Sequence, residues 1–170
     1  MLTSKDLNNN QINAYKDILR KKAMCVSSDC GFGKTIVGLS AYVLMKKRDP
    51  KAKMLVVCIP EGVKKTWSQE HLKWTHTKNL KVTPLLGNPK QRMKLLKDDS
   101  DVYVISYNLL KWLLDNNKGK DRINFSFVFA DEGDCLKGSS SKWRSYLLRV
   151  APDVKYKVIS SATPKTRDRS

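Results

Sequence analysis

Apolar runs of strand length alternate with helical patterns along the whole chain. Strands are expected near residues 23–27, 54–59, 81–86, 102–106, 125–130 and 155–160. Apolar positions at helical spacing predict helices near 9–22, 34–48, 62–76, 89–96, 108–116 and 141–150. A continuous apolar run such as 54–59 is typical of a strand that is covered on both faces. The alternation therefore predicts an α/β domain, with a mostly parallel sheet and helices on both of its faces.

A glycine-rich segment lies between the first predicted strand and the helix expected over 34–48. Residues 28–35 read Ser-Asp-Cys-Gly-Phe-Gly-Lys-Thr. At a strand-to-helix turn, backbone N–H groups and the helix N-terminus face a phosphate, and glycines let the backbone approach it closely. Lys34 is expected to reach the β- and γ-phosphates of a nucleoside triphosphate, and the Thr35 hydroxyl to coordinate Mg²⁺. The nucleotide-binding candidates are Asp29, Cys30, Gly31, Phe32, Gly33, Lys34 and Thr35.

A pair of carboxylates strengthens this interpretation. Ser28 occupies the place of the usual first glycine, so the loop taken alone is also compatible with an ordinary glycine turn. Asp131 and Glu132, however, follow the apolar strand predicted over 125–130. Asp131 is placed to hold Mg²⁺ and Glu132 to orient and deprotonate a water molecule, whereas two solvated loop carboxylates are the alternative. Together with Lys34 they are the candidate catalytic residues, with ATP and Mg²⁺ as cofactors.

The charge of the chain favours a polyanionic partner. The 170 residues are enough for one domain with a core of its own, and 33 Lys and Arg residues stand against 16 Asp and Glu, for a net charge of +17. The basic residues are spread along the chain, so a disordered basic tail is not expected. Nucleic acid is the commonest partner of such a protein. A lysine-rich composition inherited from an AT-rich genome is the alternative.

The cysteines and histidines do not indicate a disulfide framework or a metal centre. The four cysteines lack Cys-x-x-Cys spacing, which predicts buried free thiols in a reducing compartment. His71 and His76 have no further ligand nearby, so no zinc site is expected. No apolar run reaches membrane-spanning length, and the N-terminus does not resemble a signal peptide. We expect a soluble intracellular protein of the cytoplasm or nucleus; its many Asn and Lys residues suggest a viral or phage origin.

Two segments that follow predicted strands offer contacts to nucleic acid. The loop that begins at Pro60 carries exposed amides at a helix start, with Lys64 and Lys65 beside them, and such groups hold phosphates. Ser106 and Tyr107 offer a hydroxyl and an aromatic plane at the same edge of the sheet. Core packing of Tyr107 is an equally good interpretation. Trp74 is expected to be part of the core.

Seven segments in order resemble the first motor lobe of helicase superfamily 2, and most closely its Swi/Snf-type branch of DNA translocases. The resemblance covers nearly the whole chain. The matching segments are 7–11 (adenine-recognition motif), 28–35 (motif I), 60–74 (motif Ia), 86–92 (a glycine-and-arginine turn), 101–109 (motif Ib), 131–142 (motif II) and 161–164 (motif III).

The resemblance adds three residues to the candidate binding sites. It implies that Gln11 reads adenine, because a carboxamide can donate to N7 and accept from the 6-amino group. A solvated Gln before a helix is the alternative. It also implies that Gly87 and Arg92 contact nucleic acid.

The resemblance further implies a contact that couples the nucleotide site to motif III. Asp134 stands where the Swi/Snf branch usually has His, although other superfamily 2 groups have Asp there. We expect Asp134 to hydrogen-bond Ser161 or Thr163.

As a whole, the resemblance implies a RecA-like P-loop NTPase fold in which residues 1–170 form a single N-terminal helicase ATP-binding lobe. The family's second lobe is absent from this sequence and would supply an arginine finger, so the isolated lobe is expected to be nearly inactive. The partners implied are DNA and a second RecA-like lobe in cis or trans. An RNA helicase lobe and a non-catalytic module that binds nucleic acid or protein are the alternatives.

Overall fold

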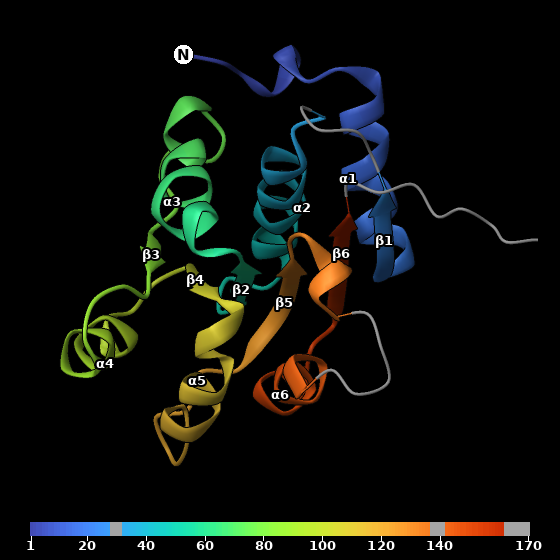
Figure 1. Cartoon of the computed structure of the whole chain (residues 1–170). Helices are drawn as coiled ribbons and strands as arrows, with labels where there is room; N and C mark the ends of the chain where they lie inside the picture. The colour runs from blue at the N-terminus through green and yellow to red at the C-terminus, as the bar shows by residue number, and fades with distance from the viewer. Residues whose placement is uncertain (28–31, 137–141, 162–170) are drawn as a thin grey trace, which may run out of the picture.

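The strands expected from the sequence form one six-stranded parallel sheet in the computed structural model (Figure 1), which describes residues 1–27, 32–136 and 142–161. The strand order is β1-β6-β5-β2-β4-β3. The strands are β1 (Ala23–Ser27), β2 (Lys53–Cys58), β3 (Val82–Pro84), β4 (Val102–Ser106), β5 (Phe125–Ala130) and β6 (Tyr156–Ser161). The predicted α/β architecture with a parallel sheet is confirmed.

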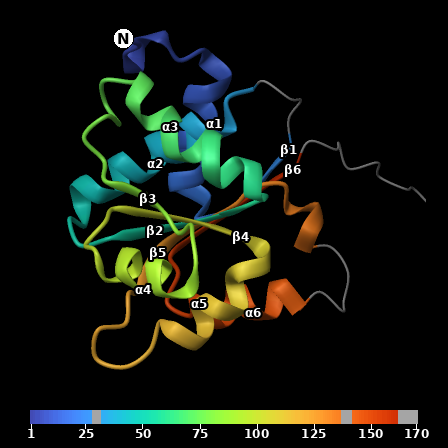
Figure 2. The ribbon, with the colours of Figure 1, turned by 60° about the vertical axis from the view of Figure 1, so that its left-hand side comes forward.

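Helices cover the two faces of this sheet in separate layers (Figure 2). One layer holds α1 (Asn9–Lys21), α2 (Lys34–Arg48) and α3 (Trp67–Glu70), and the other holds α4 (Pro89–Lys97), α5 (Leu110–Asn116) and α6 (Lys142–Val150). Short turns complete the described chain: η1 (Ser4–Asp6), η2 (Gly62–Thr66), η3 (His71–Lys73), η4 (Tyr107–Leu109) and η5 (Gly133–Leu136).

Each layer has its own apolar core. Ile18 and Phe129 are fully buried in the cluster on the α1–α2 side, and Leu55 and Leu113 in the cluster on the α4–α6 side. The central strands β2, β5 and β4 are therefore buried on both faces, as their continuous apolar sequences predict.

The helix expected over 62–76 is interrupted. Gly62–Thr66 forms a π-helical turn, a single α-helical turn follows, and the helical path ends before Trp74, which is extended. The N-terminus causes this end, because the Leu2 N–H donates to the Lys73 carbonyl and the Leu2 carbonyl accepts from the Thr75 N–H. These hydrogen bonds replace the ones that a longer helix would make. Trp74 is buried, as expected.

The prediction that the cysteines are buried is wrong for Cys25. Cys58 lies in the core, but Cys25 is exposed. Cys25 lies on β1, whose only partner among the described strands is β6, and the α4–α6 layer does not reach across to this edge. Its face of β1 is consequently left open.

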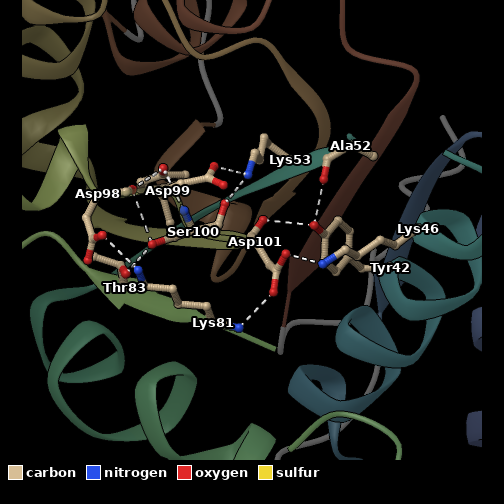
Figure 3. A network of polar contacts seen from close by, with 11 residues as sticks. Tyr42, Lys46, Ala52, Lys53, Lys81, Thr83, Asp98, Asp99, Ser100 and Asp101 are labelled. Carbon is tan, nitrogen blue, oxygen red and sulfur yellow. Dashed lines mark hydrogen bonds and ion pairs between the residues drawn. The ribbon is translucent and has the colours of Figure 1, made fainter. Parts of the chain in front are cut away.

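A polar cluster joins α2 to the sheet at the edge where the strands begin (Figure 3). The buried Tyr42 hydroxyl lies 2.7 Å from the Ala52 carbonyl oxygen and 2.9 Å from that of Asp101. The Asp101 carboxylate accepts from the Lys46 ammonium and, at 2.8 Å, from the Lys81 N–H. The cluster fixes the last turns of α2 to the starts of β2 and β4.

The described residues contain neither a membrane-spanning helix nor a cluster of potential metal ligands. No helix in this part of the chain is long and apolar enough to cross a bilayer. Among the same residues, no three His, Cys, Asp or Glu side chains are grouped so that they could hold a metal ion.

Candidate functional site

The candidate nucleotide-site residues lie at the edge of the sheet where the parallel strands end. The phosphate loop follows β1, Asp131 and Glu132 follow β5, and β6 lies between these two strands. Adjacent strands are about 4.8 Å apart, so β1 and β5 are separated by about 10 Å. Ligands of open parallel sheets bind at this carboxyl edge.

The described part of the phosphate loop leads directly into α2. Gly33 precedes the helix with φ +77°, a left-handed conformation that favours glycine. Lys34 begins the helix, is half-buried, and has no ion-pair or hydrogen-bond partner for its ammonium among the described residues. Thr35 is buried in the first turn. The other loop candidates lie outside the described residues, namely Asp29, Cys30 and Gly31.

The Asp131 carboxylate is held by three donors. Its Oδ1 accepts from the Ser160 hydroxyl at 2.5 Å and from the Glu132 N–H at 3.0 Å. Its Oδ2 accepts from the Trp67 indole N–H at 3.1 Å. The backbone is fixed as well, because the Asp131 N–H donates to the Val57 carbonyl on the neighbouring strand. This arrangement sets the orientation of both carboxylate oxygens before any ligand is present.

Glu132 turns away from the strand and into solvent. Its φ is +52°, a left-handed conformation that is uncommon for a residue with a side chain, and the residue is exposed. The next residue, Gly133, packs so closely on β6 that a Cβ there would overlap Ile159. The chain thus leaves β5 in a tight turn, in which Glu132 lies exposed directly after Asp131.

The structure brings Asp134 and Ser161 together. The Ser161 hydroxyl donates to the Asp134 carboxylate at 3.0 Å, across the gap between η5 and the end of β6. Thr163, the other candidate for this contact, lies outside the described residues.

Gln11 links α1 to the phosphate loop. Its Oε1 accepts from the Asn8 N–H at 2.9 Å and completes a capping box at the start of α1. Its Nε2 donates to the Phe32 carbonyl at 2.9 Å. The carboxamide oxygen that would face an adenine 6-amino group is therefore engaged within the chain, while Nε2 retains a second hydrogen.

The candidate nucleic-acid residues fall into two groups. Those of the loop after β2 are exposed, namely Pro60, Lys64 and Lys65. Tyr107, by contrast, is buried, and its hydroxyl donates to the Asp131 carbonyl at 2.7 Å. The structure therefore favours core packing for Tyr107. Its neighbour Ser106 is buried too.

Arg92 is packed against the protein. Its guanidinium lies 4.8 Å from the centre of the Trp112 ring and donates to the carbonyl of Gly87 at 2.5 Å. Cation–π contacts of this kind hold a guanidinium in place. The pair joins α4 to α5, and Gly87 itself is exposed with φ +91°.

Two partners of Asp131 were not recognised from the sequence. Trp67 lies in the segment that resembles motif Ia, and its indole also packs on Phe129 with ring centres 4.9 Å apart. Ser160 carries no sequence signal of its own, because serine is common and the approach of β6 to β5 is a long-range feature. The parallel register that pairs Ala130 with Ile159 is what places Ser160 beside Asp131.

Cys58 lies beneath the site at the end of β2. Burial, with a smaller contribution from the charges of Asp131 and Glu132, raises the pKa of its thiol to about 12. The thiol is therefore protonated at neutral pH and does not act as a nucleophile.

Comparison with known proteins relates this chain to one family. A family model described as SNF2-related domain matches residues 19–170. Putative protein p41 of Acyrthosiphon pisum secondary endosymbiont phage 1 is 34% identical over 74% of this chain. ATP-dependent helicase FUN30 of Saccharomyces cerevisiae is 29% identical over 96% of this chain. DNA repair and recombination protein RAD54B of Gallus gallus is 26% identical over 84%. The matches span only 27%, 15% and 16% of these three relatives.

Solved structures share the fold. The Sulfolobus solfataricus SWI2/SNF2 ATPase core in complex with dsDNA superposes with a TM-score of 0.77 and 20% identity, over 96% of this chain and 33% of its own. The UvsW helicase from bacteriophage T4 superposes with a TM-score of 0.69 and 13% identity, over 95% of this chain and 54% of its own. The expected RecA-like fold of the Swi/Snf type is confirmed.

Proposed function

Because the chain belongs to the family of SNF2-related domains, we propose that it is the ATP-binding lobe of a DNA-dependent ATPase that couples hydrolysis to movement on DNA. One observation carries the proposal. The oriented Asp131 carboxylate follows β5, and the Lys34 ammonium, which has no partner among the described residues, begins the helix that follows β1; only β6 lies between these two strands. A polyphosphate with a divalent cation is the ligand that such a pair of charges fits.

The available side chains suit a magnesium nucleotide. Lys34 and the helix N-terminus that it begins would hold the β- and γ-phosphates. Thr35 and Asp131 offer hydroxyl and carboxylate oxygens, the donor type that Mg²⁺ prefers. Bound Mg²⁺ neutralises charge on the phosphates. Gln11 is a candidate for contact with the base, through the hydrogen of Nε2 that remains.

Glu132 is the proposed general base. The residue is exposed at the carboxyl end of β5, next to Asp131, and its backbone is left-handed. It would orient a water molecule and accept its proton as the water attacks. Trp67 and Ser160 act on Asp131 as positioning residues in this scheme.

The contact between Asp134 and Ser161 is the proposed link between nucleotide and nucleic acid. It joins the turn that carries Glu132 to the end of β6. A shift of η5 on hydrolysis would therefore move the chain at the end of β6, from which motif III continues. In the complete motor this movement would reach a second lobe, which would also supply an arginine finger.

DNA is the proposed track. The exposed lysines Lys64 and Lys65 lie in the first helical turn after β2 and would contact phosphates without reading sequence. The relatives named as a DNA repair protein and as an ATPase core in complex with dsDNA favour DNA over RNA. ATPase stimulation by duplex DNA against duplex RNA distinguishes the two.

The nucleotide part of the proposal is tested by titrating the chain with Mg·ATP. We expect weak binding that Lys34→Ala abolishes and that Lys65→Ala, the matched control, leaves unchanged. DNA binding should show the reverse pattern, with a salt slope that falls by about one for each lost phosphate contact. Absence of nucleotide binding at millimolar ATP, with DNA binding retained, would favour a non-catalytic nucleic-acid module.

Turnover is tested separately. The 170 residues alone should show negligible ATPase activity, because an arginine finger from a second lobe contributes about 10³–10⁵ in rate. In the complete protein, Glu132→Gln should keep ATP binding and stop hydrolysis. Wild-type turnover by that variant would show that Glu132 is not the base.

A further inference from the structure

We propose that Tyr107 is a positioning residue for Glu132, because its hydroxyl fixes the peptide group that joins Asp131 to Glu132. This inference rests on the function proposed above, in which Glu132 is the general base. The Tyr107 hydroxyl donates to the Asp131 carbonyl at 2.7 Å. The N–H of the same peptide group belongs to Glu132 and donates to the Asp131 carboxylate at 3.0 Å. Both polar atoms of one planar group are therefore held.

The orientation of this peptide group bears directly on the conformation of Glu132. The φ angle of Glu132 describes rotation about the bond between its backbone nitrogen and its Cα, and its value is +52°. Residues with a Cβ rarely adopt this left-handed conformation, which persists where surrounding contacts impose it. The Tyr107 hydroxyl supplies such a contact on the N-terminal side of Glu132. The direction in which the Glu132 side chain leaves the backbone follows from that conformation.

The residue after Glu132 holds the turn from the other side. A Cβ at Gly133 would overlap Ile159 on β6, so the backbone is packed closely against that strand. Glu132 is exposed between these two fixed points. An exposed side chain on a backbone that is held at both ends suits a group that must meet a water molecule in one geometry.

Tyr107 is itself firmly placed. It is buried and directly follows Ser106, the last residue of β4, which pairs with Cys58 on β2. The Tyr107 ring packs on Trp143 of α6, with ring centres 5.6 Å apart. These contacts fix the hydroxyl relative to the sheet and to the α4–α6 layer. The peptide group before Glu132 is therefore referred to a rigid part of the fold.

Tyr103 provides a matched control on the same strand. It is also buried, and its hydroxyl donates to the Asp98 carbonyl at 2.7 Å, the same length as the Tyr107 bond. Asp98 precedes β4 and lies at the edge where the strands begin (Figure 3), away from the candidate site. Tyr107→Phe and Tyr103→Phe each remove one hydroxyl and keep the ring. A merely structural hydroxyl at Tyr107 predicts the same behaviour for both variants.

The first experiment uses this chain alone and a glutamate-specific endoproteinase. The chain has three glutamates, Glu61, Glu70 and Glu132, and Glu61 is exposed like Glu132. Cleavage after Glu132 is measured by mass spectrometry relative to cleavage after Glu61. We expect this ratio to rise about fivefold in Tyr107→Phe, the factor by which one net hydrogen bond shifts a local opening equilibrium. Tyr103→Phe should leave the ratio unchanged, because a general loss of stability affects both cleavage sites.

The second experiment measures turnover in the complete protein. Tyr107→Phe should lower kcat at least about tenfold and leave KM for ATP within about twofold, because a displaced base slows the chemical step without removing a contact to the nucleotide. Tyr103→Phe should leave both constants unchanged. Added to Glu132→Gln, Tyr107→Phe should cause no further loss, since the hydroxyl acts through the Glu132 carboxylate.

Several results would overturn the proposal. An unchanged cleavage ratio in Tyr107→Phe, or an equal rise in Tyr103→Phe, would do so. A further loss of turnover in the combined variant would place the effect on Asp131 or on nucleic acid instead. A slow Glu132→Gln variant beside a Tyr107→Phe variant of wild-type rate would overturn this inference and leave the proposed function intact. Wild-type turnover by Glu132→Gln would overturn the proposed role of Glu132 and this inference with it.

Discussion

Replacement of Tyr42 by Phe should destabilise the chain by about 2 kcal/mol. The side chain is fully buried, and its hydroxyl is the donor at the centre of the polar cluster where the strands begin. The Asp101 carbonyl keeps a second donor, the Met54 N–H at 3.0 Å. The Ala52 carbonyl has no other donor among the described residues, so the substitution leaves it buried and unsatisfied. A lost hydrogen bond contributes about 1 kcal/mol and an unsatisfied carbonyl about 1–3 kcal/mol, while the ring volume is unchanged.

The assay is urea unfolding followed by circular dichroism. The midpoint should fall with an unchanged slope, and Tm should decrease by about 4–8 °C for a chain of this length. Tyr15→Phe is the matched control, because this half-buried tyrosine has no hydrogen-bond partner for its hydroxyl within the described ranges. A loss no larger for Tyr42→Phe than for Tyr15→Phe would refute the reasoning and show that the Ala52 carbonyl finds another donor.

Three further predictions concern the site and its surroundings. Trp67→Phe keeps most of the ring but removes the donor to Asp131, so Mg²⁺-dependent nucleotide affinity should fall several-fold in a titration while Mg²⁺-independent binding changes less. Gly133→Ala would force a methyl group against Ile159 and should destabilise the chain by about 1–3 kcal/mol in urea unfolding; an unchanged midpoint would show that the turn can relax. Burial lowers the pKa of His71 below its ordinary value of 6.5, so the unfolded chain binds its proton more readily. The free energy of unfolding should therefore keep its full value above pH 6.5 and decrease as the pH falls below it. His71→Gln should flatten this decrease between about pH 7.5 and pH 5.5.

Local sequence patterns were sufficient to predict most of the strands and helices. The apolar run at 54–59 and the helical pattern at 34–48 correspond to β2 and α2, because burial on both faces and a 3.6-residue period leave direct marks in sequence. The end of the helical path before Trp74 leaves no such mark, since it depends on hydrogen bonds with Leu2 more than seventy residues away. The exposure of Cys25 likewise depends on β1 being at the edge of the sheet.

The candidate-site residues that stand in short motifs were predictable from the sequence, whereas those placed by strand pairing were not. Lys34 and Asp131 stand in short motifs whose spacing reflects phosphate and metal chemistry, and the structure places both at the carboxyl edge of the sheet. Ser160 was not predictable, because its role arises from the pairing of two strands. The choice for Tyr107 between core and surface also needed the packing of β4 against β2 and β3.

β6 lies between β1, which leads to the phosphate loop, and β5, which leads to Asp131, so its register affects both sides of the candidate site. Successive residues of a strand point to opposite faces, so Ser160 and Ser161 serve different partners, Asp131 and Asp134. Sliding β6 by a single residue would leave only one of these carboxylates opposite a serine, because Ile159 would replace Ser160 beside Asp131 or the residue after Ser161 would replace that serine beside Asp134. The position of this one strand thus sets the spacing between the ends of β1 and β5, and its register decides which serine each carboxylate meets.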